Sequence, residues 1–224
     1  MPEQAVARPD SRETVSLYLV GLVLLVVLPV LNVLPADDSW LHLSDFRLNQ
    51  FGKFLAFAIL ALGLDLIWGY CGVLSMGQGV FFGLGAYCMG MYLALQIGTE
   101  SVYGSELPDF MVWTQVKELP LFWYPFKSFA GGVLGAILVP VLFATLFGFL
   151  AFRSRIKGVY FAIITQALAF AAWLVFNRNE TRLGGTNGLT DFKQALGFRL
   201  SDPSTQRGLY ILTVVALGAA HLFC

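Results

Sequence analysis

Apolar runs separated by short polar segments set the pattern of this chain. The runs are Leu17–Leu34, Phe54–Trp68, Val73–Ile97, Phe129–Phe152, Gly158–Phe176 and a last run from Gly208 to Cys224. A helix needs about 20 mostly apolar residues to cross the hydrocarbon core of a bilayer. Most of the runs come close to that length. The pattern therefore predicts an all-α integral membrane protein, a polytopic helix bundle with about six spans.

The two ends of the chain differ in character. Residues 1–16 are polar, and no small-x-small cleavage site follows the first run, because Leu34 stands at the −3 position of Leu34-Pro35-Ala36. We therefore expect an uncleaved first span after a polar tail. Pro29 and Asn32 predict a kink or a hydrated end in this span. The last run is still apolar at Cys224, so we expect the membrane region, residues 17–224, to be incomplete at its C-terminus.

Composition supports a membrane protein and excludes a nucleic-acid partner. The chain is 57% hydrophobic and 12% charged, whereas about a quarter of the residues of a soluble domain are charged. Its 14 basic and 14 acidic residues balance, and no polybasic tract predicts nucleic-acid binding. Cys71, Cys88 and Cys224 lie in or beside apolar runs, which favours packing over disulfides.

Basic residues predict the orientation. Arg153, Arg155 and Lys157 lie in a very short turn, and such turns favour the cytoplasmic side. This assignment also places the N-terminus, with Arg8 and Arg12, in the cytoplasm. The loop of residues 177–207 argues against it, because its five basic residues would then lie outside.

The loop of residues 98–128 separates the third and fourth runs. It carries several aromatic residues, which predict an interfacial belt. They are Trp113, Phe122, Trp123 and Tyr124. A short helix on the membrane surface is also expected in this loop.

Residues 63–87 combine an apolar character with polar side chains and many glycines. Ser75 and Gln78 lie beside Gly77 and Gly79. Glycine weakens a helix by about 1 kcal/mol relative to alanine, so a helix break is expected here. Such a break exposes backbone groups to a solute. The alternative is close helix packing, for which Gly83 and the pair Gly131 and Gly135 are further candidates; both interpretations stay open.

Asp65 is the acid that lies well inside an apolar run. Ionisable groups in a membrane are costly and usually functional, which suggests a conducting or coupling role. The alternative is structural, because Asp65 lies near the end of its run, where it would reach water or cap a tight turn at Gly69–Gly72.

Two further segments carry candidate residues. In the fifth run, Thr165 and Gln166 share a small, weakly polar face with Ala162, Ala169 and Ala172. This face would either line a solute path or bond to a neighbouring helix. The loop with Gly184, Gly185 and Asn187 is either simply rich in turns or a docking or gating element at the outer face.

Enzyme motifs fail on spacing. His42 and His221 lie far apart and predict no metal site. A nucleophile elbow (G-x-S-x-G) needs a glycine two positions before the serine, and Gly72 lies one position too early relative to Ser75. Neither a dinucleotide fingerprint nor a Walker A lysine is present. We therefore expect no catalytic residue, no metal, no bound cofactor and no nucleotide hydrolysis by this chain.

Three segments resemble the branched-chain amino acid type permeases of ABC importers. They are residues 63–87 (GLDLIWGYCGVLSMGQGVFFGLGAY), residues 153–166 (RSRIKGVYFAIITQ) and the loop Gly184-Gly185-Thr186-Asn187-Gly188-Leu189. The last, with Phe176-Asn177-Arg178-Asn179-Glu180 before it, is most similar to the urea-transport branch. The resemblance covers about residues 50–210.

The resemblance implies partners and a location. Such a permease is a multi-pass protein of the bacterial inner membrane that pairs with a second permease subunit. A periplasmic binding protein delivers solute, and two cytoplasmic ATPase subunits bind and hydrolyse ATP. The family's further spans and its ATPase-docking loop would follow residue 224, so the resemblance implies an incomplete permease domain here.

Urea fits the polar residues, because it is small, neutral and rich in donors and acceptors. Ser75, Gln78, Thr165 and Gln166 are the predicted pathway residues. A branched-chain amino acid permease is the alternative within the family. A membrane-embedded enzyme and a passive channel are alternatives from other classes.

Overall fold

The computed structural model describes residues 19–34, 39, 42–154, 156 and 158–223. In these residues five helices are long and apolar enough to cross a membrane, and Leu19–Val33 is a shorter apolar helix. The prediction of an all-α polytopic membrane protein is confirmed. The count of six spans, the cytoplasmic N-terminus and the boundary between residues 1–16 and 17–224 stay predictions. Arg8, Arg12, Arg155 and Lys157 lie outside the described residues.

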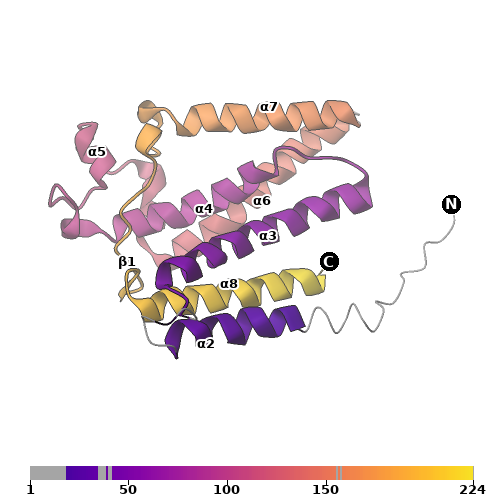
Figure 1. Cartoon of the computed structure of the whole chain (residues 1–224). Coiled ribbons are helices and arrows are strands. Elements are labelled where there is room, and N and C mark those ends of the chain that lie inside the picture. Colours follow the sequence, from indigo (N-terminus) through magenta and orange to yellow (C-terminus); the bar gives the residue numbers. More distant parts are fainter. Residues whose placement is uncertain (1–18, 35–38, 40–41, 155, 157, 224) are drawn as a thin grey trace. The chain divides into compact units, whose positions relative to one another are not determined.

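Helices dominate the described chain, and only two short strands occur in it (Figure 1). The long helices are α3 (Asp45–Cys71), α4 (Gln78–Leu95), α6 (Phe129–Arg153), α7 (Val159–Phe176) and α8 (Pro203–Phe223). The shorter elements are η1 (Val23–Val27), α2 (Leu28–Val33), η2 (Gly98–Glu100), α5 (Asp109–Trp113), η3 (Leu121–Lys127), η4 (Asn179–Thr181), η5 (Gly185–Asn187), β1 (Gln194–Ala195) and β2 (Phe198–Arg199).

The predicted ends of two helices are wrong. The run expected from Phe54 belongs to α3, which begins at Asp45, since an acid in the first turn interacts favourably with the helix dipole. Likewise α8 begins at Pro203, before the apolar run, because proline fits the first turn of a helix. The tight turn expected at Gly69–Gly72 is helical through Cys71, and the chain leaves the helix at Gly72, with φ +63°.

The described residues form two compact units, residues up to Ile59 with those from Pro203, and Leu60–Asp202. In the first unit Leu48, Tyr210 and Val214 form a buried cluster. The Tyr210 hydroxyl donates a hydrogen bond of 2.9 Å to the Leu24 carbonyl. This bond joins α8 to η1, in which Leu24 lies.

Asn32 corrects the expectation of a hydrated end to the first span. Its side chain is buried, and its amide donates to the Leu43 carbonyl at 2.7 Å and to Asp45 Oδ1 at 2.8 Å. Asn32 therefore joins α2 to the start of α3. At Pro29 the helix continues, and the π-helical turn η1 lies directly before it, as expected where proline removes a backbone donor.

In the second unit α4 packs along α6 through small residues. A Cβ atom on Gly85 would lie 3.0 Å from the Ala136 carbonyl oxygen, and one on Gly135 would lie 3.4 Å from Cys88 Cβ of α4. The Phe126 ring of η3 would lie nearer still to the Cβ atom on Gly135, at 2.5 Å. These glycines allow the two backbones to approach closely, as in other membrane helix pairs. α7 also packs against α4, where the Tyr87 and Phe176 rings lie 4.2 Å apart between centroids.

The loops of residues 98–128 and 177–202 cover the same end of this unit (Figure 1). Met111 and Trp123 are fully buried there, and Trp123 Nε1 donates to the Arg182 carbonyl at 3.2 Å. Trp123 is therefore a core residue, and its assignment to the interfacial belt is wrong. Trp113, Phe122 and Tyr124 are exposed. The expected short helix is α5.

A two-residue hairpin completes this end. Gln194 pairs with Arg199 and Ala195 with Phe198, and the turn residues Leu196 and Gly197 both have positive φ, as a tight hairpin turn requires. The Leu196 amide donates to the Tyr92 hydroxyl at 3.3 Å, which fixes the hairpin on α4.

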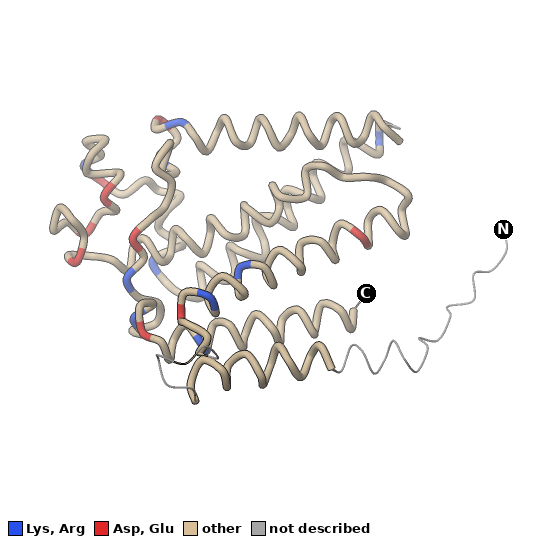
Figure 2. The backbone as a smooth tube through the Cα atoms, viewed as in Figure 1, with Lys and Arg blue, Asp and Glu red and all other residues tan. Residues whose placement is uncertain are grey.

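Charged side chains in the second unit gather in the loops and at helix ends (Figure 2). α4 and α7 contain none, and α6 contains only Arg153, in its last turn. The three helices therefore present uncharged surfaces along their lengths.

Candidate functional site

The segment 72–77 between α3 and α4 is not helical, and we call it the unwound segment. The helix break expected around Gly77 lies at the beginning of α4, whose first residue is Gln78 and whose N-cap is Gly77. The break leaves the backbone of this segment free to bond to something other than its own helix.

One of those bonds goes to α7. The Met76 amide donates to Thr165 Oγ1 at 3.0 Å, and the same hydroxyl donates to the Ala162 carbonyl at 2.9 Å. Thr165 is 1% exposed and Met76 is 55% exposed, so the hydroxyl is buried and the bond is partly buried. A hydroxyl that accepts one bond and donates another uses both of its capacities.

Gly77 makes the close approach possible. A Cβ atom at this position would lie 2.5 Å from the Thr165 carbonyl oxygen, closer than real Cβ atoms approach a backbone. Gly77 is also buried. The segment therefore lies directly on the backbone of α7, and a larger residue would push it away.

The remaining predicted pathway residues differ in burial and in their neighbours. Ser75 is buried beside Met76, at 4% exposure. Gln78 is partly buried, and its amide nitrogen lies 3.6 Å from where a Cβ atom of Gly63 would be. Gln166 is exposed. The structure thus brings the 72–77 segment against Thr165 and Gln166 of α7, whereas the Gln78 amide lies beside Gly63 of α3. Contact of any of these residues with solute stays a prediction.

Gln166 lines a cavity of about 580 Å³ between α7 and the unwound segment. The walls are mainly apolar and include Met76, Ala162 and Ile163. Among the described residues that line the cavity, Gln166 alone has a carboxamide side chain. The other residues that line the cavity are Trp68, Gly72, Leu74, Gly158 and Val159. The cavity has the size range of small-molecule sites, roughly 300–1,000 Å³.

The other glycines of the sequence prediction have different surroundings. A Cβ atom on Gly79 or Gly83 would meet no atom within 4 Å, so neither makes a close contact within the described residues. A Cβ atom on Gly131 would meet the Pro125 carbonyl. Asp65 is exposed in the last two turns of α3.

The loop at Gly184 is compact. Gly184 and Gly185 are buried and have φ of +100° and +55°, values that side chains disfavour. A Cβ atom on Gly185 would meet Asn179 Oδ1. Asn187 is exposed and lines a cavity with residues of the 98–113 segment.

Sequence reasoning missed two features of this unit. The Met76 amide as a partner of α7 left no signal, because any residue has an amide. Asp109 lines the same cavity as Asn187, and the proline before it was the one hint of a helix start there. In the described part of the chain no group of three His, Cys, Asp or Glu side chains is placed to hold a metal.

Comparison with known proteins gives one match. The family model described as "Branched-chain amino acid transport system / permease component" matches residues 46–224. No curated protein and no solved structure matches the chain.

Proposed function

The chain belongs to the permease component family of branched-chain amino acid transport systems, and we propose that it passes a small polar solute through the membrane as part of an ATP-driven importer. As a permease component it is a transport subunit. The solute that we favour is urea. The family match and the five membrane-length helices support a multi-pass membrane subunit.

The observation that carries the proposal is the unwound segment on α7. Discontinuous helices hold solutes in membrane carriers, because their free backbone groups and helix ends face a cavity at membrane depth. Here the Met76 amide and Thr165 hold the non-helical connection of residues 72–77 on α7. Gln166 lines the cavity beside this connection, and Gln78 begins the helix that follows it.

Urea suits this region because the polar groups are neutral. Ser75, Gln78, Thr165 and Gln166 offer hydroxyl and carboxamide groups that donate and accept. No charged residue lies in α4 or α7. A zwitterion would need charged partners or helix ends for its carboxylate.

A branched-chain amino acid is the second candidate solute. The family description names that transport system, and the apolar walls of the 580 Å³ cavity suit an aliphatic side chain. Separate measurements of urea uptake and of leucine uptake distinguish these two candidate solutes.

The proposed assembly follows from the family. It contains a second permease subunit, two cytoplasmic ATPase subunits that bind ATP, and a periplasmic solute-binding protein, in the bacterial inner membrane. The basic end of α6 at Arg153 favours a cytoplasmic position for the α6–α7 turn. The loops of residues 98–128 and 177–202 then face the periplasm.

Uptake of radiolabelled urea and leucine by cells with the complete importer tests the proposal. The variants are Gln78→Leu and Gln166→Leu, with Gln50→Leu as a control, because Gln50 lies in α3 outside the site. Loss of one amide contact should raise the KM for the transported solute by about two- to tenfold. The protein level should stay unchanged. Normal uptake by both site variants would contradict their pathway role, and uptake of leucine without urea would replace urea by the second candidate.

A further inference from the structure

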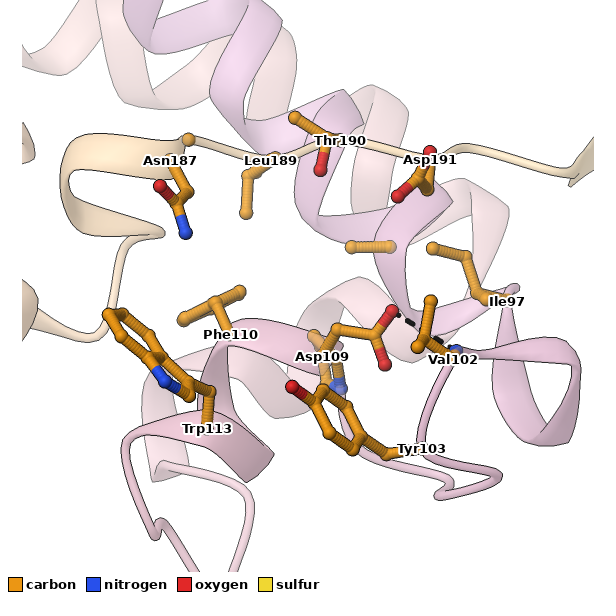
Figure 3. Close-up of a pocket in the computed structure, with 13 residues that line it drawn as sticks. Ile97, Val102, Tyr103, Asp109, Phe110, Trp113, Asn187, Leu189, Thr190 and Asp191 are labelled. Atoms are coloured by element: carbon orange, nitrogen blue, oxygen red, sulfur yellow. Dashed lines mark hydrogen bonds between the residues drawn. The ribbon is translucent and has the colours of Figure 1, made fainter.

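A second cavity lies at the loop-covered end of the second unit (Figure 3). Its volume is about 380 Å³, within the range of small-molecule sites. We call it the loop pocket. It is lined by the end of α4 and by two loop segments, and its residues are Ala94, Ile97, Val102, Tyr103, Pro108, Asp109, Phe110, Trp113, Asn187, Gly188, Leu189, Thr190 and Asp191.

Asp109 has an unused acceptor in the wall of this pocket. Its Oδ2 accepts from the Val102 amide at 3.3 Å, while its Oδ1 is buried and has no hydrogen-bond partner among the described residues. A buried acceptor without a donor is costly, the more so in a carboxylate. Rotation about the last side-chain torsion of aspartate is soft, so either oxygen can turn toward the cavity.

The remaining polar groups also favour a donor-bearing ligand. Figure 3 shows the Thr190, Asp191 and Asn187 side chains along one side of the pocket and Asp109 on the other. No lysine, arginine or histidine occurs among the lining residues, all of which the structure describes. The carboxylates of Asp109 and Asp191 therefore give the pocket a negative formal charge that no lining cation balances.

Apolar side chains complete the pocket. Ile97, Phe110 and Leu189 line it, and Leu189 also belongs to the cluster packed around Met111. The walls are therefore part of a packed core, which holds the acceptors in place.

We propose that the loop pocket binds a small solute through its N–H groups, with the Asp109 carboxylate as the acceptor. The amide groups of urea and the ammonium group of an amino acid share this chemistry. The choice between these solutes rests on the proposed function, since both are candidates for transport. The pocket would hold the solute at the end of the unit that the orientation places in the periplasm, before it reaches the unwound segment.

The surroundings of Asp191 help to tell the two solutes apart. Asp191 also lines a neighbouring cavity of about 280 Å³, which contains Lys193 and Arg199. An amino acid has a carboxylate that these cations would attract, whereas urea has none. Removal of the cations should therefore weaken leucine binding and leave urea binding unchanged.

Equilibrium dialysis of the full chain in detergent micelles tests the site, with radiolabelled urea and radiolabelled leucine as separate probes. Asp109→Asn keeps an oxygen for the Val102 amide but removes the charge, and should weaken binding by about tenfold or more. Asp191→Asn should weaken it less, because Asp191 is exposed. Asparagine tolerates the left-handed backbone at this position, where φ is +60°.

Glu118→Gln is the control, because Glu118 is an exposed acid in the loop of residues 98–128 but outside the pocket. Gel filtration shows which variants are folded. If Asp109→Asn does not fold, the binding measured for Asp191→Asn tests the pocket instead. Wild-type protein that binds neither probe, or variants that bind as the wild type does, would overturn the pocket. Uptake by cells is a separate readout: normal urea uptake with unchanged binding in Asp109→Asn rejects the pocket and keeps the proposed function.

Discussion

At the scale of single residues, Gly77 and Gly79 should respond in opposite ways to alanine. Gly77→Ala places a methyl group 2.5 Å from the Thr165 carbonyl oxygen, and neither backbone can yield easily, so we expect a loss of about 1–3 kcal/mol. Gly79→Ala meets no atom within 4 Å in the first turn of α4, and should be neutral or stabilise by up to about 1 kcal/mol. Thermal unfolding in detergent measures both. Equal melting temperatures would contradict the close contact.

Thr165 gives a second prediction, on the bond to the Met76 amide. Thr165→Val keeps the shape but removes the acceptor, so the partly buried Met76 N–H loses its partner at a cost of about 1 kcal/mol. Thr165→Ser keeps the hydroxyl and should lose less. Hydrogen exchange of the 72–77 segment should accelerate in the valine variant only. Equal exchange in the two variants would show that the bond does not hold the segment.

At the scale of elements, Trp123 joins the two loops that cover one end of the second unit. Trp123→Phe removes the indole N–H that donates to the Arg182 carbonyl. We expect a loss of about 1 kcal/mol or more, because a hydrogen bond and core volume are both lost. Limited proteolysis should then cut the 177–202 loop faster. Trp113→Phe, at an exposed position, is the control; equally fast cleavage in both variants would contradict the role of Trp123.

The same loops show which elements the sequence could predict. The sequence predicted α6 and α7 almost to the residue, because no charged residue interrupts their long apolar runs. The start of α3 was missed because Asp45, Arg47 and Lys53 look like a loop, although a helix that leaves the bilayer carries charges on its first turns. Trp123 and Asn32 were misplaced for a common reason. Both residue types are typical of wet boundaries, and only their tertiary partners bury them.

At the scale of the whole molecule, the candidate site was predictable in its residue types and not in its pairing. Polar side chains in apolar runs single out Ser75, Gln78, Thr165 and Gln166, since such groups in a membrane bond to a neighbouring helix or line a cavity. Met76 and Thr165, however, are separated by 89 positions, and neither periodicity nor composition reports a contact at that distance. The loop pocket escaped prediction for the same reason, because its two acids come from separate loops.

The arrangement of the helices in the second unit predicts which positions can be labelled from each side of the membrane. α6 has 25 residues, so its ends lie about 37 Å apart, more than the thickness of the hydrocarbon core. The loops that contain Glu118 and Thr186 cover one end of the unit, and Ser154 follows the last turn of α6 at the other (Figure 1). Cysteines at these three exposed positions should therefore label from two different sides of the membrane.

The measurement uses a membrane-impermeant maleimide on intact and on permeabilised cells, in a background with Cys71, Cys88 and Cys224 replaced. Glu118→Cys and Thr186→Cys should react in intact cells, and Ser154→Cys only after permeabilisation, because the basic turn favours the cytoplasm. If Glu118→Cys and Thr186→Cys react from opposite sides of the membrane, the two loops do not cover the same end of the unit, and this part of the fold is wrong. If all three react with reversed sidedness, the fold stands and the orientation is inverted, which would place the loop pocket on the ATPase side of the membrane.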